Sequence, residues 1–310
     1  MKKIFITGGA GYVGCALTDY LIENEYFVTV YDLFLYGEDV FSSTKNIRLI
    51  KGDIRNTNLL KDSIIGHDVV IHLACISNDP SFELNPKLGK SINLDAFEPL
   101  VDIAKKNKVK RFIYASSSSV YGIKDIKNVH EKIKLDPITD YSKFKANCEE
   151  TLNKYNDDNF SGVTIRPATV CGYSKRQRLD VIVNILTNIG FHKKEISIFG
   201  GNQLRPNIHI KDMIRAYKVL IDAPNKLVSG EIFNAGWENK SVLDIAHEAK
   251  SMLGNDVELE IIPTDDNRSY HISSEKIKNE LNFKTKFTIA DAIKDLKDIF
   301  ENNQLNDPLN

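Results

Sequence analysis

Two residues whose side chains can transfer protons, Tyr141 and Lys145, stand four positions apart, so in a helix they share one face. The pKa of a free phenol is near 10 and must fall to about 7 for acid–base work at neutral pH, a change worth roughly 4 kcal/mol. A neighbouring ammonium group in a desolvated cleft lowers the pKa of a phenol. The chain holds 12 Tyr and 32 Lys in 310 residues. About one such pair is therefore expected by chance, and its place in the fold must decide its meaning.

Three glycines, Gly8, Gly11 and Gly14, stand three residues apart where an expected strand passes into an expected helix. The spacing suits a turn that holds the pyrophosphate of a dinucleotide. One glycine allows the tight turn, one lets the backbone approach the phosphates, and one packs the helix on the strand. A plain glycine turn is the alternative for an isolated triplet. Because this triplet opens the first strand–helix–strand unit, we favour the dinucleotide site.

A carboxylate follows the second expected strand, since Asp32 stands eighteen residues after Gly14. There it can accept hydrogen bonds from both ribose hydroxyls of an adenosine, and it would repel a 2′-phosphate. The sequence between Tyr31 and Glu38 contains no arginine to neutralise such a phosphate. We therefore predict NAD rather than NADP, with a solvated turn aspartate as the alternative. Asp53, after the third strand, is a further candidate at the adenine edge.

The elements that must position these residues alternate along the chain. Apolar runs predict strands at 4–7, 27–31, 47–50, 69–74, 111–115, 163–165 and 231–235. Helical spacing lies between them, most clearly at 15–22, 93–107 and 141–155. Strands that alternate with helices predict an α/β fold with a doubly wound, largely parallel Rossmann sheet.

The alternation breaks after about residue 168. A helix is expected near 180–189, apolar runs follow at 196–201 and 208–210, and a helix is expected at 212–221. After residue 241, two helices should flank a strand at 258–262. We predict that residues 1–170, completed by about 212–236, form a nucleotide-binding domain. Residues 171–211 and 237–310 should form a smaller C-terminal lobe.

Composition excludes several classes of protein. With 42% hydrophobic and 27% charged residues the chain can form a core. A formal net charge of −1 without a long basic run argues against nucleic acid as a partner. The four cysteines are scattered and predict neither disulfides nor a metal site. Free cysteines are typical of a reducing compartment, so we expect a cytoplasmic protein. The apolar run at 69–76 is far shorter than the roughly 20 residues of a membrane helix, and no membrane association is expected.

The motifs together resemble those of extended short-chain dehydrogenases/reductases, in the branch of nucleotide-sugar epimerases and dehydratases. The resemblance covers nearly the whole chain. It rests on TGGAGYVG at 7–14, Asp32, GDI at 52–54, DVVIHLA at 68–74, Asn93, SSSSVYG at 116–122, YSKFK at 141–145, Arg166-Pro167 and LRPNIHIKD at 204–212. It implies an NAD-dependent enzyme that acts on a nucleotide-diphosphate sugar bound by the smaller lobe.

The resemblance also implies roles for individual residues. Tyr141 would be the acid/base, and Lys145 would hold the nicotinamide ribose and lower the pKa of the phenol. Ser117 would hydrogen-bond the reacting hydroxyl, with Ser118 as the alternative and Ser116 as a structural residue. Cofactor contacts are implied for Gly8, Gly11, Tyr12, Val13, Gly14, Asp32, Asp53, Ile54, Leu73, Ala74, Asn93, Tyr141, Lys145 and Pro167.

For the substrate, the resemblance implies that Arg205 and Arg268 bind the diphosphate, which suits the planar guanidinium group. Plain surface charge is the alternative for both. Further substrate contacts are expected from Ser77, Asn78, Ser118, Thr169 and Arg178. His209 and Asp212 are expected to be structural. Pro206-Asn207 stands where the family usually has an aspartate and an aromatic residue, so the sugar and the base stay open.

One local difference bears on the reaction. Family members that eliminate water across C5–C6 carry an Asp-Glu pair where this chain has Ser118 and Ser119. Two hydroxyls cannot serve as a carboxylic acid and a carboxylate, which disfavours a 4,6-dehydratase. We expect a 4-epimerase, with a 4-dehydrogenase or 4-ketoreductase as the alternative. A non-catalytic NAD-binding protein is a different class. A homodimer through the helices that carry Asn93 and Tyr141 is also expected.

Overall fold

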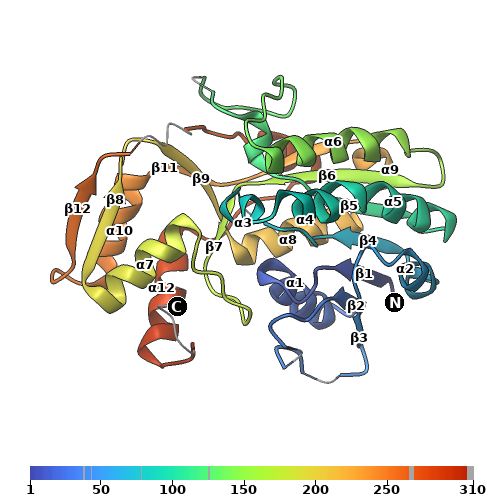
Figure 1. The fold of residues 1–310 in the computed structure, drawn as a ribbon, viewed down its shortest axis with the longest axis horizontal. Coiled ribbons are helices and arrows are strands. Elements are labelled where there is room, and N and C mark those ends of the chain that lie inside the picture. Colours follow the sequence, from blue (N-terminus) through green and yellow to red (C-terminus); the bar gives the residue numbers. More distant parts are fainter. Residues whose placement is uncertain (38, 43, 78, 125, 265–268, 306–310) are drawn as a thin grey trace.

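The computed structural model describes residues 1–310 apart from 38, 43, 78, 125, 265–268 and 306–310. Its central sheet is built from β1 (Lys3–Thr7), β2 (Phe27–Asp32), β3 (Ile47–Lys51), β4 (Val69–His72), β5 (Arg111–Ala115), β6 (Ser161–Pro167) and β10 (Ile232–Ala235). All pairs are parallel, in the order β10-β6-β5-β4-β1-β2-β3 (Figure 1). The order reverses between β1 and β4, so a crevice for a ligand is expected beyond the carboxyl ends of these two strands. The predicted Rossmann sheet is confirmed.

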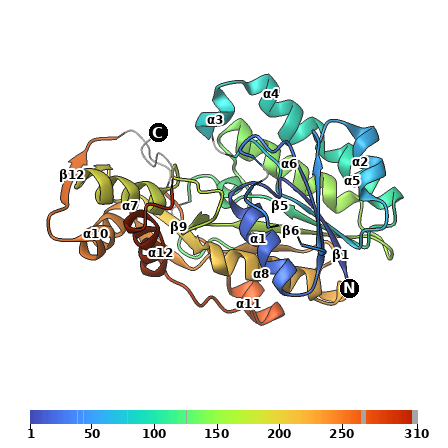
Figure 2. The same cartoon turned by 90° about the horizontal axis from the view of Figure 1, so that it is seen from below.

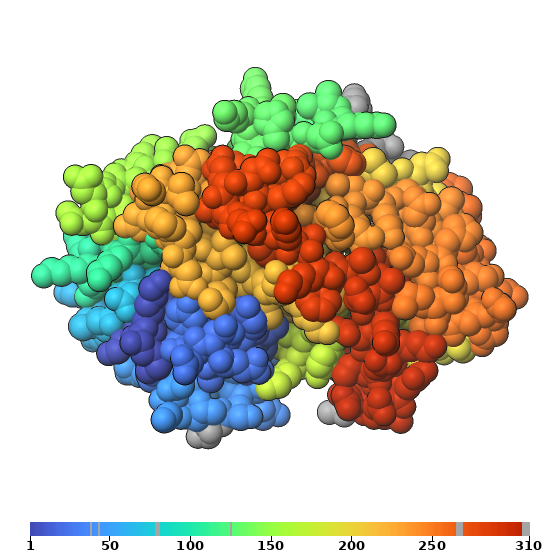
Figure 3. All heavy atoms as spheres, turned by 180° about the vertical axis from the view of Figure 1, so that it is seen from behind, coloured from blue at the N-terminus to red at the C-terminus, as the bar shows by residue number. Residues whose placement is uncertain are grey.

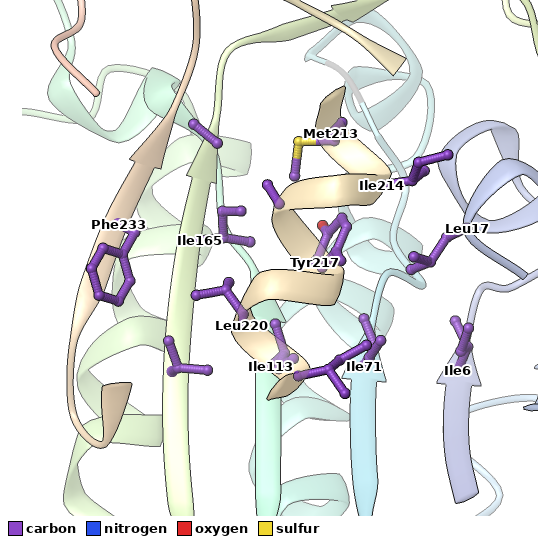
Figure 4. Close-up of a cluster of buried hydrophobic side chains, with 14 of the residues drawn as sticks. Ile6, Leu17, Ile71, Ile113, Ile165, Met213, Ile214, Tyr217, Leu220 and Phe233 are labelled. Atoms are coloured by element: carbon purple, nitrogen blue, oxygen red, sulfur yellow. The ribbon is translucent and has the colours of Figure 1, made fainter. Parts of the chain in front are cut away.

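Helices cover both faces of this sheet. One face carries α1 (Tyr12–Glu23) and α8 (Ile210–Asp222), which lie side by side in Figure 2. The other face carries α2 (Thr57–Ile64), α5 (Phe97–Lys106) and α6 (Asp140–Lys154). Alternate residues of β1 serve the two cores, since Ile4 and Ile6 pack with the first set and Phe5 with the second. Figure 4 shows the first core, where Tyr217 and Leu220 of α8 point at the sheet.

Shorter helical segments connect these elements. They are α3 (Asp79–Glu83), α4 (Pro86–Lys90), the π-helical turn η1 (Ser91–Asp95), the 3-10 turn η2 (Ser118–Tyr121) and α9 (Asn225–Val228). The helical stretch predicted at 93–107 is present, with its first residues in the π-helical turn η1 and most of the rest in α5. A π-turn shifts the helical register locally, and such turns are frequent at functional sites.

A second group of elements lies beside the sheet. A three-stranded sheet joins β11 (Glu238–Ser241), β9 (Leu204–His209) and β7 (Thr169–Cys171), and β12 (Glu258–Ile262) pairs with β8 (Glu195–Phe199). Helices α7 (Ile182–Lys193), α10 (Val242–Leu253) and α12 (Ile289–Glu301) close a separate core with them. The C-terminal helices α12 and α11 (Glu275–Leu281) lie on the outer surface (Figure 3). The prediction of two helices after residue 241 is wrong, because α11 is a third.

In the described part of the chain, no helix combines the length and apolar character needed to cross a bilayer. Among the same residues, no group of three His, Cys, Asp or Glu side chains could hold a metal ion. All four cysteines are free thiols; Cys15, Cys148 and Cys171 are buried, and Cys75 is half-buried.

Candidate active site

The glycine turn lies beyond the end of β1, next to the residues that follow β4. Gly8 has a positive φ of 75°, and a Cβ atom there would stand 2.5 Å from the backbone nitrogen of Ala74. A Cβ atom on Gly14 would stand 2.4 Å from the carbonyl oxygen of Gly8. Both positions therefore exclude a side chain, and Gly11 stands directly before the first turn of α1. This narrow backbone cradle at a helix N-terminus fits a pyrophosphate.

Asp32 lies beside this cradle, at the end of β2. Its two carboxylate oxygens accept hydrogen bonds from the backbone N–H of Ala10 at 3.0 Å and of Phe34 at 2.9 Å. Asp32 is only half-buried, and each carboxylate oxygen has lone pairs left to accept further hydrogen bonds, such as those of a ribose. The structure thus brings Asp32 and the glycine turn together, as the sequence predicted.

Asp53 presents a different picture. Its carboxylate pairs with the guanidinium of Arg55, with Nη2 and Oδ2 2.5 Å apart, and the hydrogen bonds from Arg55 hold the pKa of Asp53 below its usual range. The backbone oxygen of Asp53 accepts a hydrogen bond from Tyr31, and the adjacent Ile54 is buried. A contact between the Asp53 carboxylate and an adenine stays a prediction, and that carboxylate already has a partner.

Tyr12, at the start of α1, directs its side chain toward the second group of elements. Its hydroxyl donates to the backbone oxygen of Gly172 at 2.6 Å and accepts from Asn184 of α7 at 3.2 Å. Burial is the main reason that the pKa of Tyr12 is raised. The backbone oxygen of Tyr12 accepts from Ser174 at 2.7 Å. Any contact of Tyr12 with the cofactor would therefore come from its place at the helix N-terminus rather than from its phenol. The half-buried Val13 shares this place at the helix N-terminus.

The candidate acid–base pair lies at the start of α6. A capping box between Thr139 and Ser142 satisfies the free N–H groups there and determines where the helix begins. Lys145 is buried, and its ammonium donates to the backbone oxygen of Ala115 at 2.7 Å. The same nitrogen lies 5.7 Å from the ring centroid of Tyr141. The helix therefore holds phenol and ammonium together against the carboxyl end of β5.

Opposing effects act on the pKa of Lys145. Burial lowers it, whereas the thiol of Cys75 and the phenol of Tyr141 raise it, so the pKa of Lys145 is raised overall. The lysine stays an ammonium in this buried position and can lower the pKa of a phenol beside it. Sequence reasoning missed Cys75 as a neighbour of this pair. Its position directly after Ala74, at the end of β4, was the available signal.

The serine run leaves β5 at the same edge. Ser117 caps η2, and its Oγ accepts hydrogen bonds from the backbone N–H of Ser119 at 3.1 Å and its hydroxyl at 2.9 Å. Ser117 is half-buried, whereas Ser118 is almost fully buried. Ser116 is buried and donates to the carboxylate of Glu149 in α6, a contact that fits its expected structural role.

Asn93 lies in η1 and connects β4 to α6. Its side-chain amide accepts from the backbone N–H of Ile76 at 2.9 Å and donates to the oxygen of Ile76 at 3.0 Å. The backbone carbonyl oxygen of Asn93 accepts a hydrogen bond from the thiol of Cys148 at 3.3 Å. Asn93 thus orders the segment after β4, where Leu73 and Ala74 lie half-buried beside the glycine turn.

The described candidate substrate residues come from the segment after β4, from η2, from β7 and β9, and from the loop after β7. Arg178 pairs with Asp180 and donates to the backbone oxygen of Ser77 at 3.2 Å, which links the loop after β7 to the segment after β4. Thr169 pairs with Asn207 between β7 and β9. Arg205 lies on β9, and Pro167 ends β6. Asn78 and Arg268 lie outside the described residues.

His209 and Asp212 have contacts that fit structural roles. His209 caps α8, and its Nδ1 accepts from the backbone N–H of Lys211 at 3.0 Å. Asp212 is fully buried, and its carboxylate accepts from the backbone N–H groups of Lys286 and Phe287.

Known proteins share this arrangement. Residues 4–236 match the model of a family described as "NAD dependent epimerase/dehydratase family". An uncharacterized UDP-glucose epimerase of Bacillus subtilis is 30% identical over 81% of this chain and 82% of its own length. A trifunctional UDP-glucose 4,6-dehydratase/3,5-epimerase/reductase of Arabidopsis thaliana is 27% identical over 97% of this chain, which spans 47% of that larger protein.

A solved structure extends the likeness to three dimensions. The UDP-glucuronic acid 4-epimerase of Bacillus cereus, in complex with UDP-glucuronic acid and NAD, is 26% identical and superposes with a TM-score of 0.86. The match covers 97% of this chain and 99% of that one. Since the family match spans most of the chain and agrees with the observed cradle, this protein belongs to the NAD-dependent epimerase/dehydratase family and is an extended short-chain dehydrogenase/reductase that uses NAD.

Proposed function

We propose that this chain is a nucleotide-sugar 4-epimerase, which oxidises the sugar at C4 and then reduces it from the opposite face. The observation that carries the oxidation and reduction at C4 is the buried Lys145 ammonium, which donates to Ala115 and lies beside the ring of Tyr141 at the sheet edge where we expect NAD to bind. The names of two similar proteins, a UDP-glucose epimerase and a UDP-glucuronic acid 4-epimerase, support this reaction.

NAD would be held by the cradle of Gly8, Gly11 and Gly14, with the Asp32 carboxylate on the adenosine ribose and Lys145 on the nicotinamide ribose. A Cβ atom on Gly8 or Gly14 would meet backbone atoms of the protein at 2.5 Å or less, so only glycine keeps this tight turn at the N-terminus of α1, where a helix favours a phosphate. The chemistry that bound NAD would supply is reversible acceptance of a hydride from the sugar carbon.

The protein's own part is proton transfer. Tyr141 Oη would accept the proton of the C4 hydroxyl and later return it, while the Lys145 ammonium stabilises the phenolate. Ser117 Oγ would hydrogen-bond the same sugar oxygen and fix its orientation, with Ser118 as the alternative donor. A positioned side chain that transfers a proton contributes about 10²- to 10⁴-fold to a rate.

Dehydratases occur among the similar proteins, and the serine run argues against that reaction here. Removal of water needs a carboxylic acid and a carboxylate near the sugar, and Ser118 and Ser119 offer hydroxyls instead. Both hydroxyls lie in a tight turn: Ser118 is buried, and Ser119 donates to Ser117. The same turn therefore suits oxidation and reduction at C4 without elimination.

The substrate would be a nucleotide-diphosphate sugar that binds between residues 1–170 and the lobe of residues 171–211 and 237–310. We propose that Arg205 and Arg268 bind the diphosphate, and that Ser77, Asn78, Thr169 and Arg178 contact the sugar or the base. We also propose a cytoplasmic homodimer through α5 and α6. A monomer mass in light scattering at micromolar concentration would contradict this assembly.

The test is to incubate the purified protein with UDP-, GDP-, CDP- and dTDP-sugars without added cofactor, and to follow product mass and the C4 proton by NMR. An unchanged mass with inverted C4 would support the 4-epimerase. A product two mass units lighter, with growing absorbance of reduced nicotinamide, would replace it with a 4-dehydrogenase. Loss of the mass of water would favour a dehydratase.

A further inference from the structure

A buried ion pair lies behind the proposed reacting residues. The carboxylate of Glu149 accepts two hydrogen bonds from Arg166, from Nε at 3.0 Å and from Nη2 at 2.6 Å. The side chains of Arg166 and Glu149 are 2% and 4% exposed. Burial alone lowers the pKa of Arg166, but the hydrogen bonds and charge of Glu149 raise it overall, so the guanidinium stays ionised.

Glu149 belongs to the same helix face as the acid–base pair. Tyr141, Lys145 and Glu149 follow one another at four-residue spacing along α6, so they form one stripe. Lys145 donates to the backbone of Ala115, and Glu149 accepts from the hydroxyl of the next residue, Ser116. Two consecutive residues at the end of β5 are therefore attached to two consecutive turns of α6.

Arg166 extends this attachment to three further elements. It lies on β6, and its Nη1 donates to the hydroxyl of Tyr121, in η2, at 2.8 Å. That hydroxyl donates in turn to Asn234 of β10 at 2.7 Å. The turn that begins with Ser117 is thus held from both ends, by Ser116 on Glu149 and by Tyr121 on Arg166.

The energetics of such a pair favour a geometric role. Desolvation of two buried charges offsets most of their attraction, so a buried ion pair adds little net stability. A planar guanidinium bound to a carboxylate through two parallel hydrogen bonds, in contrast, fixes the relative orientation of its partners. Apolar contacts alone would let α6 rotate or slide against β5 and β6 by fractions of an ångström.

We propose that Glu149 and Arg166 are positioning residues, which hold the α6 stripe and the Ser117 turn in register so that Tyr141, Lys145 and Ser117 meet one sugar hydroxyl. This inference rests on the proposed function, because it assigns the pair a role in that same reaction. It also predicts an effect on NAD binding, since Lys145 is expected to hold the nicotinamide ribose.

The test compares Arg166→Lys with a matched control, Arg215→Lys. Lysine keeps the positive charge but cannot form the double hydrogen bond. Arg215 pairs with the fully buried Asp212 and donates to the backbone oxygen of Lys284, away from α6. For both variants and the wild type we would measure kcat, KM for the sugar, the Kd of NAD and the thermal unfolding midpoint.

If the pair positions the reacting groups, Arg166→Lys lowers kcat by about 10-fold or more, because small misplacements of reacting groups are costly. KM changes less than twofold, and the Kd of NAD rises severalfold. Arg215→Lys leaves kcat and the Kd within twofold of wild type. Equal kcat values for the two variants, with equal losses in unfolding midpoint, would overturn the inference and leave the pair a structural one.

A second variant separates positioning from stability. In Glu149→Leu/Arg166→Met both buried charges are replaced by side chains of similar volume, which is often neutral for stability. Because Ser116 loses its acceptor in this variant, we expect an unfolding midpoint no lower than that of Ser116→Ala, and a kcat still lowered by about 10-fold. A double variant that matches wild type in both kcat and unfolding midpoint would contradict the proposal. If the wild type converts no nucleotide sugar, the proposed function fails, and the Kd of NAD in the same variants still decides this inference.

Discussion

The Lys145 ammonium donates to the backbone oxygen of Ala115 at 2.7 Å, and this contact joins the helix that carries Tyr141 to the strand that leads into Ser117. The three candidate reacting residues come from segments up to 28 positions apart in the sequence. A buried charge on a carbonyl oxygen is costly to displace, because the ammonium would lose its acceptor without gaining water. The site is therefore held before any substrate arrives.

Replacement of Tyr141 by Phe should abolish turnover without loss of the fold. The change removes only the hydroxyl that exchanges a proton with the sugar, so kcat should fall by about 10²- to 10⁴-fold, whereas NAD affinity should change little. Tyr155→Phe is the control, because its hydroxyl donates to Glu98 near the surface, at 3.3 Å. The measurement is the initial rate on the accepted nucleotide sugar. Unchanged turnover in Tyr141→Phe would remove the proposed mechanism.

Two adjacent serines should behave differently. Ser117→Ala removes the proposed hydrogen bond to the reacting hydroxyl and should lower kcat by about 10-fold or more. Because Ser117 also caps η2, the change should lower the free energy of unfolding by about 0.5–2 kcal/mol. Ser116→Ala removes a buried hydrogen bond to Glu149 and should lower the free energy of unfolding by about 1–3 kcal/mol. Rates and urea unfolding of both variants give the comparison. If Ser118→Ala lowers kcat more than Ser117→Ala, the role belongs to Ser118.

The sequence predicted the central sheet well because its strands other than the edge strand β3 are largely buried on both faces. All seven appear as apolar runs, and only β4 ends two residues earlier than expected, at His72. The polar strand β11 and the three-residue β7 carry no such pattern, because pairing with β9 rather than local sequence makes them strands.

Within the site, motifs located residues but not their partners. The glycine turn and Asp32 lie together as expected, whereas the pairing of Asp53 with Arg55 and the direction of the Tyr12 side chain depend on neighbours that spacing does not reveal. The Glu149–Arg166 pair was missed for a related reason, since charged residues are rarely buried unless paired and the partner lies on another element.

Gly14→Ala should damage the cofactor site and the fold together. A Cβ atom there would stand 2.4 Å from the oxygen of Gly8 and 2.6 Å from the carbonyl carbon of Gly9, so the backbone must move. We expect NAD affinity to fall by at least about 10-fold and stability by about 1–3 kcal/mol. Gly66→Ala is the control. Its φ of 77° makes the substitution strained, but nothing lies within 4 Å, so stability should fall while NAD affinity stays unchanged.

His72 should make the protein less stable in mild acid. Burial, with a smaller effect of the Lys145 charge, lowers the pKa of His72 to about 3, and its Nδ1 lies 2.7 Å from the hydroxyl of Thr7. The unfolded chain takes up a proton near pH 6.5 and the folded chain does not, so stability falls as the pH drops from about 6.5 toward 3. The loss between pH 7 and pH 5 should be about 2 kcal/mol.

The variant His72→Gln isolates this effect, because glutamine can keep a hydrogen bond to Thr7 but does not titrate. Urea unfolding at pH 7, 6 and 5 should give a curve of stability against pH that is flatter than that of wild type by about 2 kcal/mol over this range. Parallel curves for His72→Gln and wild type would mean that His72 takes up its proton in the folded protein as readily as in the unfolded chain, and would contradict the prediction.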